Sequence, residues 1–160
     1  MTGRTVEATG RPAELLLVED NYGDVLLARE AFRNAKIANN LAVASDGEQA
    51  MAMLRREGPY GNQALPDLIL LDLNLPRMDG REVLRAIKAE PRLRLIPVVI
   101  LTSSKAEIDI VKSYELKANS YIVKPVDFER LREIVASLET FWFTIVVLAA
   151  APAGEQVRAA

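Results

Sequence analysis

The sequence predicts an α/β fold, a doubly wound five-stranded parallel sheet with helices on both faces. Short apolar runs, each long enough for one buried strand, alternate along the chain with amphipathic segments of helical periodicity. Most of these runs end at a polar or charged residue, where a parallel sheet presents the carboxyl ends of its strands. We therefore expect one sheet with right-handed crossovers and a site at one of its edges.

The strands and helices follow from these runs in chain order. Gly and Pro keep the segments 57–62 and 74–80 out of helix and strand, and Pro91 ends the third helix. Asp24 can cap the first helix or lie in its first turn. The expected strands are 14–19, 41–44, 67–71, 98–102 and 120–123. The expected helices are 24–35, 47–56, 80–89, 105–117 and a last one from about 127.

The chain is expected to hold one domain, over residues 13–140. Residues 1–12 and 151–160 are expected to be flexible tails, because they lack apolar periodicity. The segment 141–150 is an apolar extension of the last helix, too short for the ~20 residues that span a bilayer. We expect a cytoplasmic protein that does not contact a membrane.

Composition excludes several classes of chemistry. The chain has 20 basic and 22 acidic residues and a formal net charge of −2, which gives no footprint for direct nucleic acid binding. It has no Cys and no His, so thiol nucleophiles, Ser-His-Asp relays and a phosphohistidine are excluded. A phosphoryl group used here must come from another molecule.

Three carboxylates are expected to crowd together at the sheet edge: Glu19, Asp20 and Asp72. Two such charges ~4 Å apart repel by ~4 kcal/mol at an effective dielectric near 20, so a cation or a raised pKa is required. Hard oxygen ligands suit Mg²⁺, with Mn²⁺ as the alternative. We expect Asp20, Asp72 and the Asn74 main-chain carbonyl to coordinate the ion, with Glu19 acting through a water.

The same edge carries groups suited to phosphoryl transfer. Asp72 can attack phosphorus to form an acyl phosphate, and the Lys124 ammonium can offset the developing negative charge. Thr102 can donate a hydrogen bond to a phosphoryl oxygen and shift towards it, and Tyr121 is the candidate partner of that shift. Taken singly, these residues also fit simpler roles. The acidic pair can cap a helix, and Lys124 can be an ordinary surface lysine. Thr102 can form a strand-end turn, and Tyr121 can pack at the edge of the sheet.

Four motifs in this order resemble the receiver domain of two-component response regulators, from about Glu14 to Leu138. They are LLVEDN at 16–21, LILLDLNLPRMDG at 68–80, VILTSS at 99–104 and YIVKPV at 121–126. The resemblance implies a flavodoxin-like, receiver-type fold and a phosphoacceptor that assists its own phosphorylation and dephosphorylation. It further implies that Asp72 is the phosphoacceptor, Glu19 and Asp20 the metal pocket, Thr102 and Tyr121 the switch pair, and Lys124 the phosphate-binding lysine.

Further stretches resemble the small stand-alone regulators that partner phytochrome-type histidine kinases. They lie at 109–114, 119–128 and 141–146. The resemblance implies a sensor histidine kinase as phosphodonor, with a bacteriophytochrome as the candidate. Apolar side chains cover almost the whole circumference of the helical extension 141–150, and one domain can bury only one side of it. We therefore expect a homodimer arm there, together with the face formed by helix 105–117, strand 120–123 and the last helix.

Other interpretations stay open at this point. A small Mg²⁺-dependent phosphohydrolase would also use Asp72 as nucleophile, although such enzymes usually carry Asp rather than Asn at position 74. A phosphate-independent interaction module is a third class. The extension 141–150 can alternatively lie on a membrane surface or form a strand.

Overall fold

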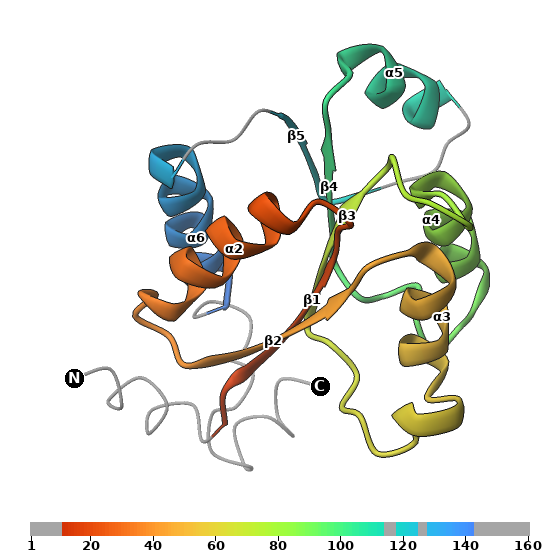
Figure 1. Ribbon diagram of the computed structural model, residues 1–160, viewed down its shortest axis with the longest axis horizontal. Coiled ribbons are helices and arrows are strands. Elements are labelled where there is room, and N and C mark those ends of the chain that lie inside the picture. Colours follow the sequence, from red (N-terminus) through yellow and green to blue (C-terminus); the bar gives the residue numbers. More distant parts are fainter. Residues whose placement is uncertain (1–10, 114–117, 125–127, 143–160) are drawn as a thin grey trace, which may run out of the picture.

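The computed structural model describes residues 11–113, 118–124 and 128–142. Within them, five strands form one sheet in the order β2-β1-β3-β4-β5, and all neighbouring pairs are parallel (Figure 1). The strands are β1 (Ala13–Val18), β2 (Asn39–Ala44), β3 (Leu68–Asp72), β4 (Val98–Thr102) and β5 (Ser120–Val123). The helices are α2 (Tyr22–Arg33), α3 (Gly47–Arg55), α4 (Gly80–Ala89), α5 (Lys105–Ser113), α6 (Phe128–Trp142) and the 3₁₀ turn η1 (Gly58–Tyr60). The predicted fold class is confirmed.

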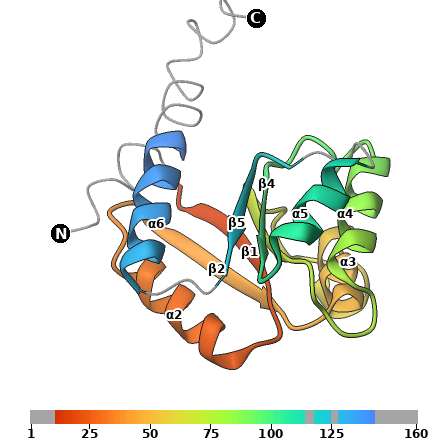
Figure 2. The same cartoon turned by 90° about the horizontal axis from the view of Figure 1, so that it is seen from above.

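Helices cover both faces of the sheet. Helices α2 and α6 lie on one face, and α3, α4 and α5 lie on the other (Figures 1 and 2). Side chains alternate between the faces along a strand, so Leu15 and Leu17 pack in the cluster that includes α2 and α6. Leu16 and Val18 pack in the opposite cluster with α3 and α4. These two cores fix the position of β1, at whose carboxyl end the acidic pair begins.

Helix starts follow strand ends closely and are held by side-chain caps. Asn21 caps α2 by accepting from the Asp24 amide at 2.9 Å. Asp46 caps α3 in the same way, and Asp79 forms a capping box with Glu82 at the start of α4. Such caps satisfy amides that have no partner within the helix, so each turn at the carboxyl edge is locally specified.

Some predicted boundaries were shifted. Strand β1 begins and ends one residue before the predicted 14–19, and β2 begins at Asn39 instead of 41. Helix α2 begins at Tyr22, two residues early, because Asn21 and not Asp24 is the cap; Asp24 occupies the first turn. The predicted loop 57–62 contains the turn η1, with Pro near its start.

Several predictions lie outside the described residues. They concern most of the tail 1–12, the end of the predicted helix 105–117, the extension 141–150 beyond Trp142 and the tail 151–160. Among the helices that the structure describes, none has the length and apolar character needed to cross a membrane.

Candidate functional site

An open hollow lies at the carboxyl ends of β1, β3 and β5. Its wall combines carboxylates, amides and a single ammonium among the described residues. The lining residues are Glu19, Asp20, Asn21, Tyr22, Asp24, Asp72, Asn74, Ser103 and Lys124. The structure thus brings together the predicted residues Glu19, Asp20, Asp72, Asn74 and Lys124.

Strand β1 delivers the acidic pair. The Glu19 amide donates to the Ala44 carbonyl at 2.9 Å, which extends the pairing of β1 with β2 by one residue. The Glu19 side chain is buried, 1% exposed, and its Oε2 accepts from the Asn21 amide at 3.1 Å. Asp20 is exposed. One carboxylate is therefore fixed inside the wall and its neighbour faces the open hollow.

Asp72 is the last residue of β3. It pairs with Leu101 of β4 and is 4% exposed. Its Oδ1 accepts from the Asn74 amide at 2.9 Å, and its Oδ2 accepts from Lys124. Both oxygens of this carboxylate are thus held in defined positions.

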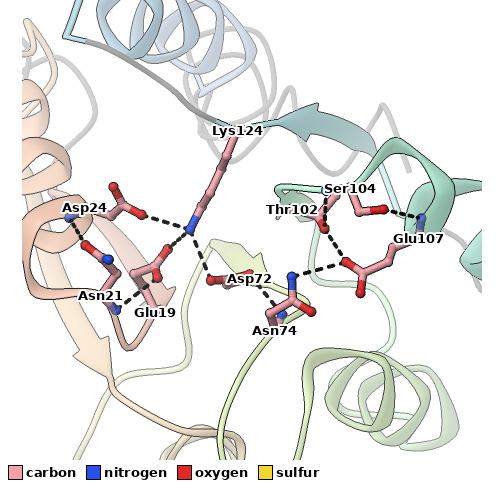
Figure 3. A network of polar contacts seen from close by, with 9 residues as sticks. All are labelled: Glu19, Asn21, Asp24, Asp72, Asn74, Thr102, Ser104, Glu107 and Lys124. Carbon is pink, nitrogen blue, oxygen red and sulfur yellow. Dashed lines mark hydrogen bonds and ion pairs between the residues drawn. The ribbon is translucent and has the colours of Figure 1, made fainter.

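Lys124 contacts three carboxylates at once. Its Nζ donates to Glu19 Oε1 at 2.6 Å, Asp24 Oδ2 at 3.0 Å and Asp72 Oδ2 at 3.1 Å (Figure 3). The Lys124 amide donates to the Thr102 carbonyl at 2.6 Å, which anchors the start of the side chain to β4. This arrangement uses all three protons of the ammonium.

The pocket carries more negative charge than one ammonium neutralises. Burial raises the pKa of Glu19 to about 7, opposed by the hydrogen bond from Lys124 and reinforced by the charge of Asp72. For Lys124, burial lowers the pKa, but the hydrogen bonds to Glu19 and Asp24 outweigh this, so its pKa lies above its ordinary value. Lys124 is a permanent cation, whereas Glu19 is close to accepting a proton at neutral pH.

This excess charge fits a divalent cation. One oxygen each from Glu19, Asp20 and Asp72 lies within 4.8 Å of the others. Carboxylate oxygens around an open position match the ligand preferences of Mg²⁺ and Mn²⁺. Burial is the main cause of the raised pKa of Glu19, and a cation in the hollow would oppose it by favouring the charged carboxylate.

Neither predicted switch residue lines the hollow; Thr102 directly precedes the lining residue Ser103, and Tyr121 lies within β5. Thr102 is fully buried at the end of β4, and its Oγ1 donates to Glu107 Oε1 at 2.6 Å instead of pointing at Asp72 (Figure 3). The Tyr121 hydroxyl accepts from the Ala118 amide at 3.2 Å. The Lys112 ammonium lies 4.9 Å from the centre of the Tyr121 ring.

Two residues of this network, Asp24 and Glu107, were not predicted from the sequence as part of the site. Asp24, expected only as a helix cap or first-turn residue, also accepts a hydrogen bond from Lys124 Nζ. Its signal was its place in the first turn of a helix that starts at the sheet's carboxyl edge. Glu107, in the first turn of α5, holds Thr102 and gave no sequence signal that separates it from other surface acids.

A parallel five-stranded sheet with an acidic pair, an aspartate and a lysine at its carboxyl edge defines the receiver class of signalling domains. The model of the response regulator receiver domain matches residues 15–136, and the chain belongs to this family. The chain is similar to "Response regulator Rcp1" of Synechocystis sp., with 46% identity over 140 residues, 88% of this chain and 95% of Rcp1.

Two solved structures are also similar. The phosphorylated cyanobacterial phytochrome response regulator RcpA has a TM-score of 0.75 and 48% identity, over 83% of this chain and 95% of RcpA. The Mn²⁺-bound form of Rcp1 has a TM-score of 0.74 and 46% identity, over 84% of this chain and 97% of that chain. The predicted resemblance to phytochrome response regulators is therefore confirmed, and this protein is a response regulator of the two-component type.

Proposed function

We propose that this protein accepts a phosphoryl group on Asp72 from a phosphohistidine of a sensor kinase. The observation that carries the proposal is the set of contacts of Lys124, which ties Asp72 to Glu19 and Asp24 at one edge of the sheet. One Asp72 oxygen attacks phosphorus while the phosphorus–nitrogen bond of the donor breaks, and that electron pair returns to the imidazole. The products are an aspartyl phosphate and a free histidine on the kinase.

Each pocket residue has a distinct part in this transfer. Asp72 is held with both oxygens bonded, which reduces the freedom it would lose on reaching the transition state. Lys124 offsets negative charge on the phosphoryl oxygens, and its raised pKa keeps it charged throughout. The carboxylates of Glu19, Asp20 and Asp72, together with Asn74 in the wall of the hollow, would hold Mg²⁺ or Mn²⁺, which when bound supplies charge neutralisation at the phosphoryl oxygens.

The phosphodonor that we propose is a phytochrome-type histidine kinase, such as a bacteriophytochrome. The similarity to RcpA and Rcp1 supports this choice, since RcpA is described as a phytochrome response regulator. The cytoplasm is the compartment in which we place the exchange. We also propose that the chain assists dephosphorylation of Asp72, because the same charged groups surround the bond that water would cleave.

We further propose that phosphorylation acts through a homodimer. The interface would be formed by the last helix, α6, together with the adjoining surfaces of α5 and β5. Ile110 of α5 and Val123 of β5, exposed by 41% and 45%, support a contact on that face. Light scattering with and without Mg²⁺ and beryllofluoride tests this proposal; a monomer of 17.7 kDa under both conditions would contradict it.

Phosphoryl transfer is tested with acetyl phosphate or a phosphorylated kinase and Mg²⁺. We expect wild-type protein to be labelled and Asp72→Asn to take up no phosphate. Asp109→Asn is the matched control, because Asp109 is an exposed carboxylate on α5 outside the hollow, and it should label like wild type. Labelling of Asp72→Asn at the wild-type level would contradict the assignment. Multiple turnover of small phosphate esters would instead favour a phosphohydrolase.

A further inference from the structure

Glu107 joins three elements around the proposed phosphorylation site. Its Oε1 accepts from Thr102 Oγ1 at 2.6 Å and from Asn74 Nδ2 at 3.2 Å (Figure 3). Its amide donates to Ser104 at the start of α5. One carboxylate oxygen therefore connects the end of β4, the loop after Asp72 and the first turn of α5.

The bond from Thr102 to Glu107 excludes a bond from Thr102 to a phosphoryl oxygen. A threonine hydroxyl has a single proton to donate, and that proton is given to Glu107. Thr102 also accepts from the Ser104 amide at 3.3 Å, so its acceptor side is engaged as well. A phosphoryl oxygen is an acceptor only, so Thr102 can bind it only after leaving Glu107.

The hydrogen bond from Thr102 to Glu107 is strong enough to oppose movement of the Thr102 side chain. Hydrogen bonds between a hydroxyl and a carboxylate are short and stronger than neutral ones, and this one is formed by a threonine with no solvent exposure. Glu107 is only partly buried, so its carboxylate can reach solvent once the threonine leaves. Moving Thr102 away from Glu107 therefore costs mainly the free energy of this hydrogen bond.

We infer that Glu107 is a positioning residue that holds Thr102 in the resting state and opposes its move to the phosphoryl group. This inference rests on the proposed function. Phosphorylation of Asp72 then has to draw Thr102 away from Glu107, which releases the first turn of α5. The signal enters α5 at Glu107, on the helix whose Lys112 also lies against the ring of Tyr121.

Binding of beryllofluoride, a phosphoryl mimic, to the full chain with Mg²⁺ tests the inference by calorimetry. Glu107→Ala should bind about tenfold more tightly than wild type, because no bond to Thr102 has to be broken. Glu107→Gln keeps an uncharged acceptor and should give a smaller gain. Asp109→Ala removes the same charge from the same helix and should change affinity by less than about twofold.

A double-mutant cycle separates the bond from a general charge effect. In a Thr102→Val background, Glu107→Ala should no longer tighten binding, because there is no hydroxyl to release. In protein without beryllofluoride, three-bond couplings to the Thr102 γ-carbon should report one rotamer in wild type and averaging in Glu107→Ala. Circular dichroism melting curves establish that each variant is folded.

The outcomes distinguish this inference from the proposed function. If wild type binds beryllofluoride and Glu107→Ala does not differ from Asp109→Ala, or tightens equally in the Thr102→Val background, the role of Glu107 is overturned. If wild type does not bind beryllofluoride at all, the phosphoacceptor proposal fails, and control by Glu107 fails with it. Tightening that depends on Thr102, with a freed rotamer, supports the inference.

Discussion

Lys124 Nζ lies 3.1 Å from Asp72 Oδ2, although the two residues are 52 positions apart in the sequence. Lys124 directly follows β5 and Asp72 is the last residue of β3, and β4 lies between these two strands in the sheet. Neighbouring strands are about 4.8 Å apart, so the lysine must cross about 10 Å. Only a long side chain anchored at the strand end can place a cation on Asp72 from that position.

Replacement of Lys124 by methionine should destabilise the metal-free protein. Methionine keeps much of the apolar stem but leaves Glu19, Asp24 and Asp72 without their shared cation. We expect a loss of about 3 kcal/mol in the free energy of unfolding at pH 8, and less at pH 6, where Glu19 takes up a proton. Urea unfolding measures this difference.

Magnesium should recover part of the stability that Lys124→Met loses, since a second cation then offsets the same carboxylates. Lys36→Met is the matched control, because the Lys36 side chain is exposed and outside the hollow. Equal stabilities of the two variants at pH 8 would show that Lys124 does not neutralise the pocket.

The metal-free protein should lose stability as the pH rises through the titration of Glu19. Its pKa is raised to about 7 from 4.5, so between these values the folded protein binds more protons than the unfolded chain. Proton uptake by the folded state makes the free energy of unfolding fall with rising pH. The contribution is fully present below about pH 4.5, is lost above about pH 7, and is about 3 kcal/mol at most.

Glu19→Gln isolates this effect, because an amide keeps the shape of the side chain and does not titrate. The difference in unfolding free energy between wild type and Glu19→Gln should change with pH over the same window in EDTA. With saturating Mg²⁺, which favours the charged carboxylate, the change should move to lower pH. A difference that stays constant from pH 4 to pH 8 in EDTA would rule out a raised pKa for Glu19.

Most of the fold was predictable because each strand is a separate apolar run. The bounds of β4, β5 and α4 are those predicted, and Pro97 before β4 and Pro91 after α4 mark two of these bounds locally. The start of α2 was not, because Asn21 and Asp24 are both good caps by residue type. Only the backbone at Asn21, with ψ at 114°, decides which of the two precedes the helix.

The candidate site was predictable where side chains follow strands directly. Asp72 and Lys124 could be placed at one edge because parallel strands align their carboxyl ends. The contacts of Asp24 and Glu107 depend on how α2 and α5 are oriented on the sheet, which the apolar pattern does not define. For the same reason the resting partner of Thr102 became visible only in the structure.

Gly80 should be required for the position of Asp72. A Cβ at residue 80 would lie 2.3 Å from the Asp72 carbonyl oxygen and 2.4 Å from the Leu73 Cα, so backbone must move to admit alanine. The Gly80 amide also donates to the Leu73 carbonyl at 2.9 Å, which fixes the start of α4 against the end of β3. We expect Gly80→Ala to cost about 1–3 kcal/mol and to slow labelling of Asp72 by acetyl phosphate. Gly61→Ala is the control, because its Cβ would meet its nearest atom, the Gly58 carbonyl oxygen, at 3.9 Å. Gly80→Ala protein that unfolds and labels like Gly61→Ala would show that the close contact does not position Asp72.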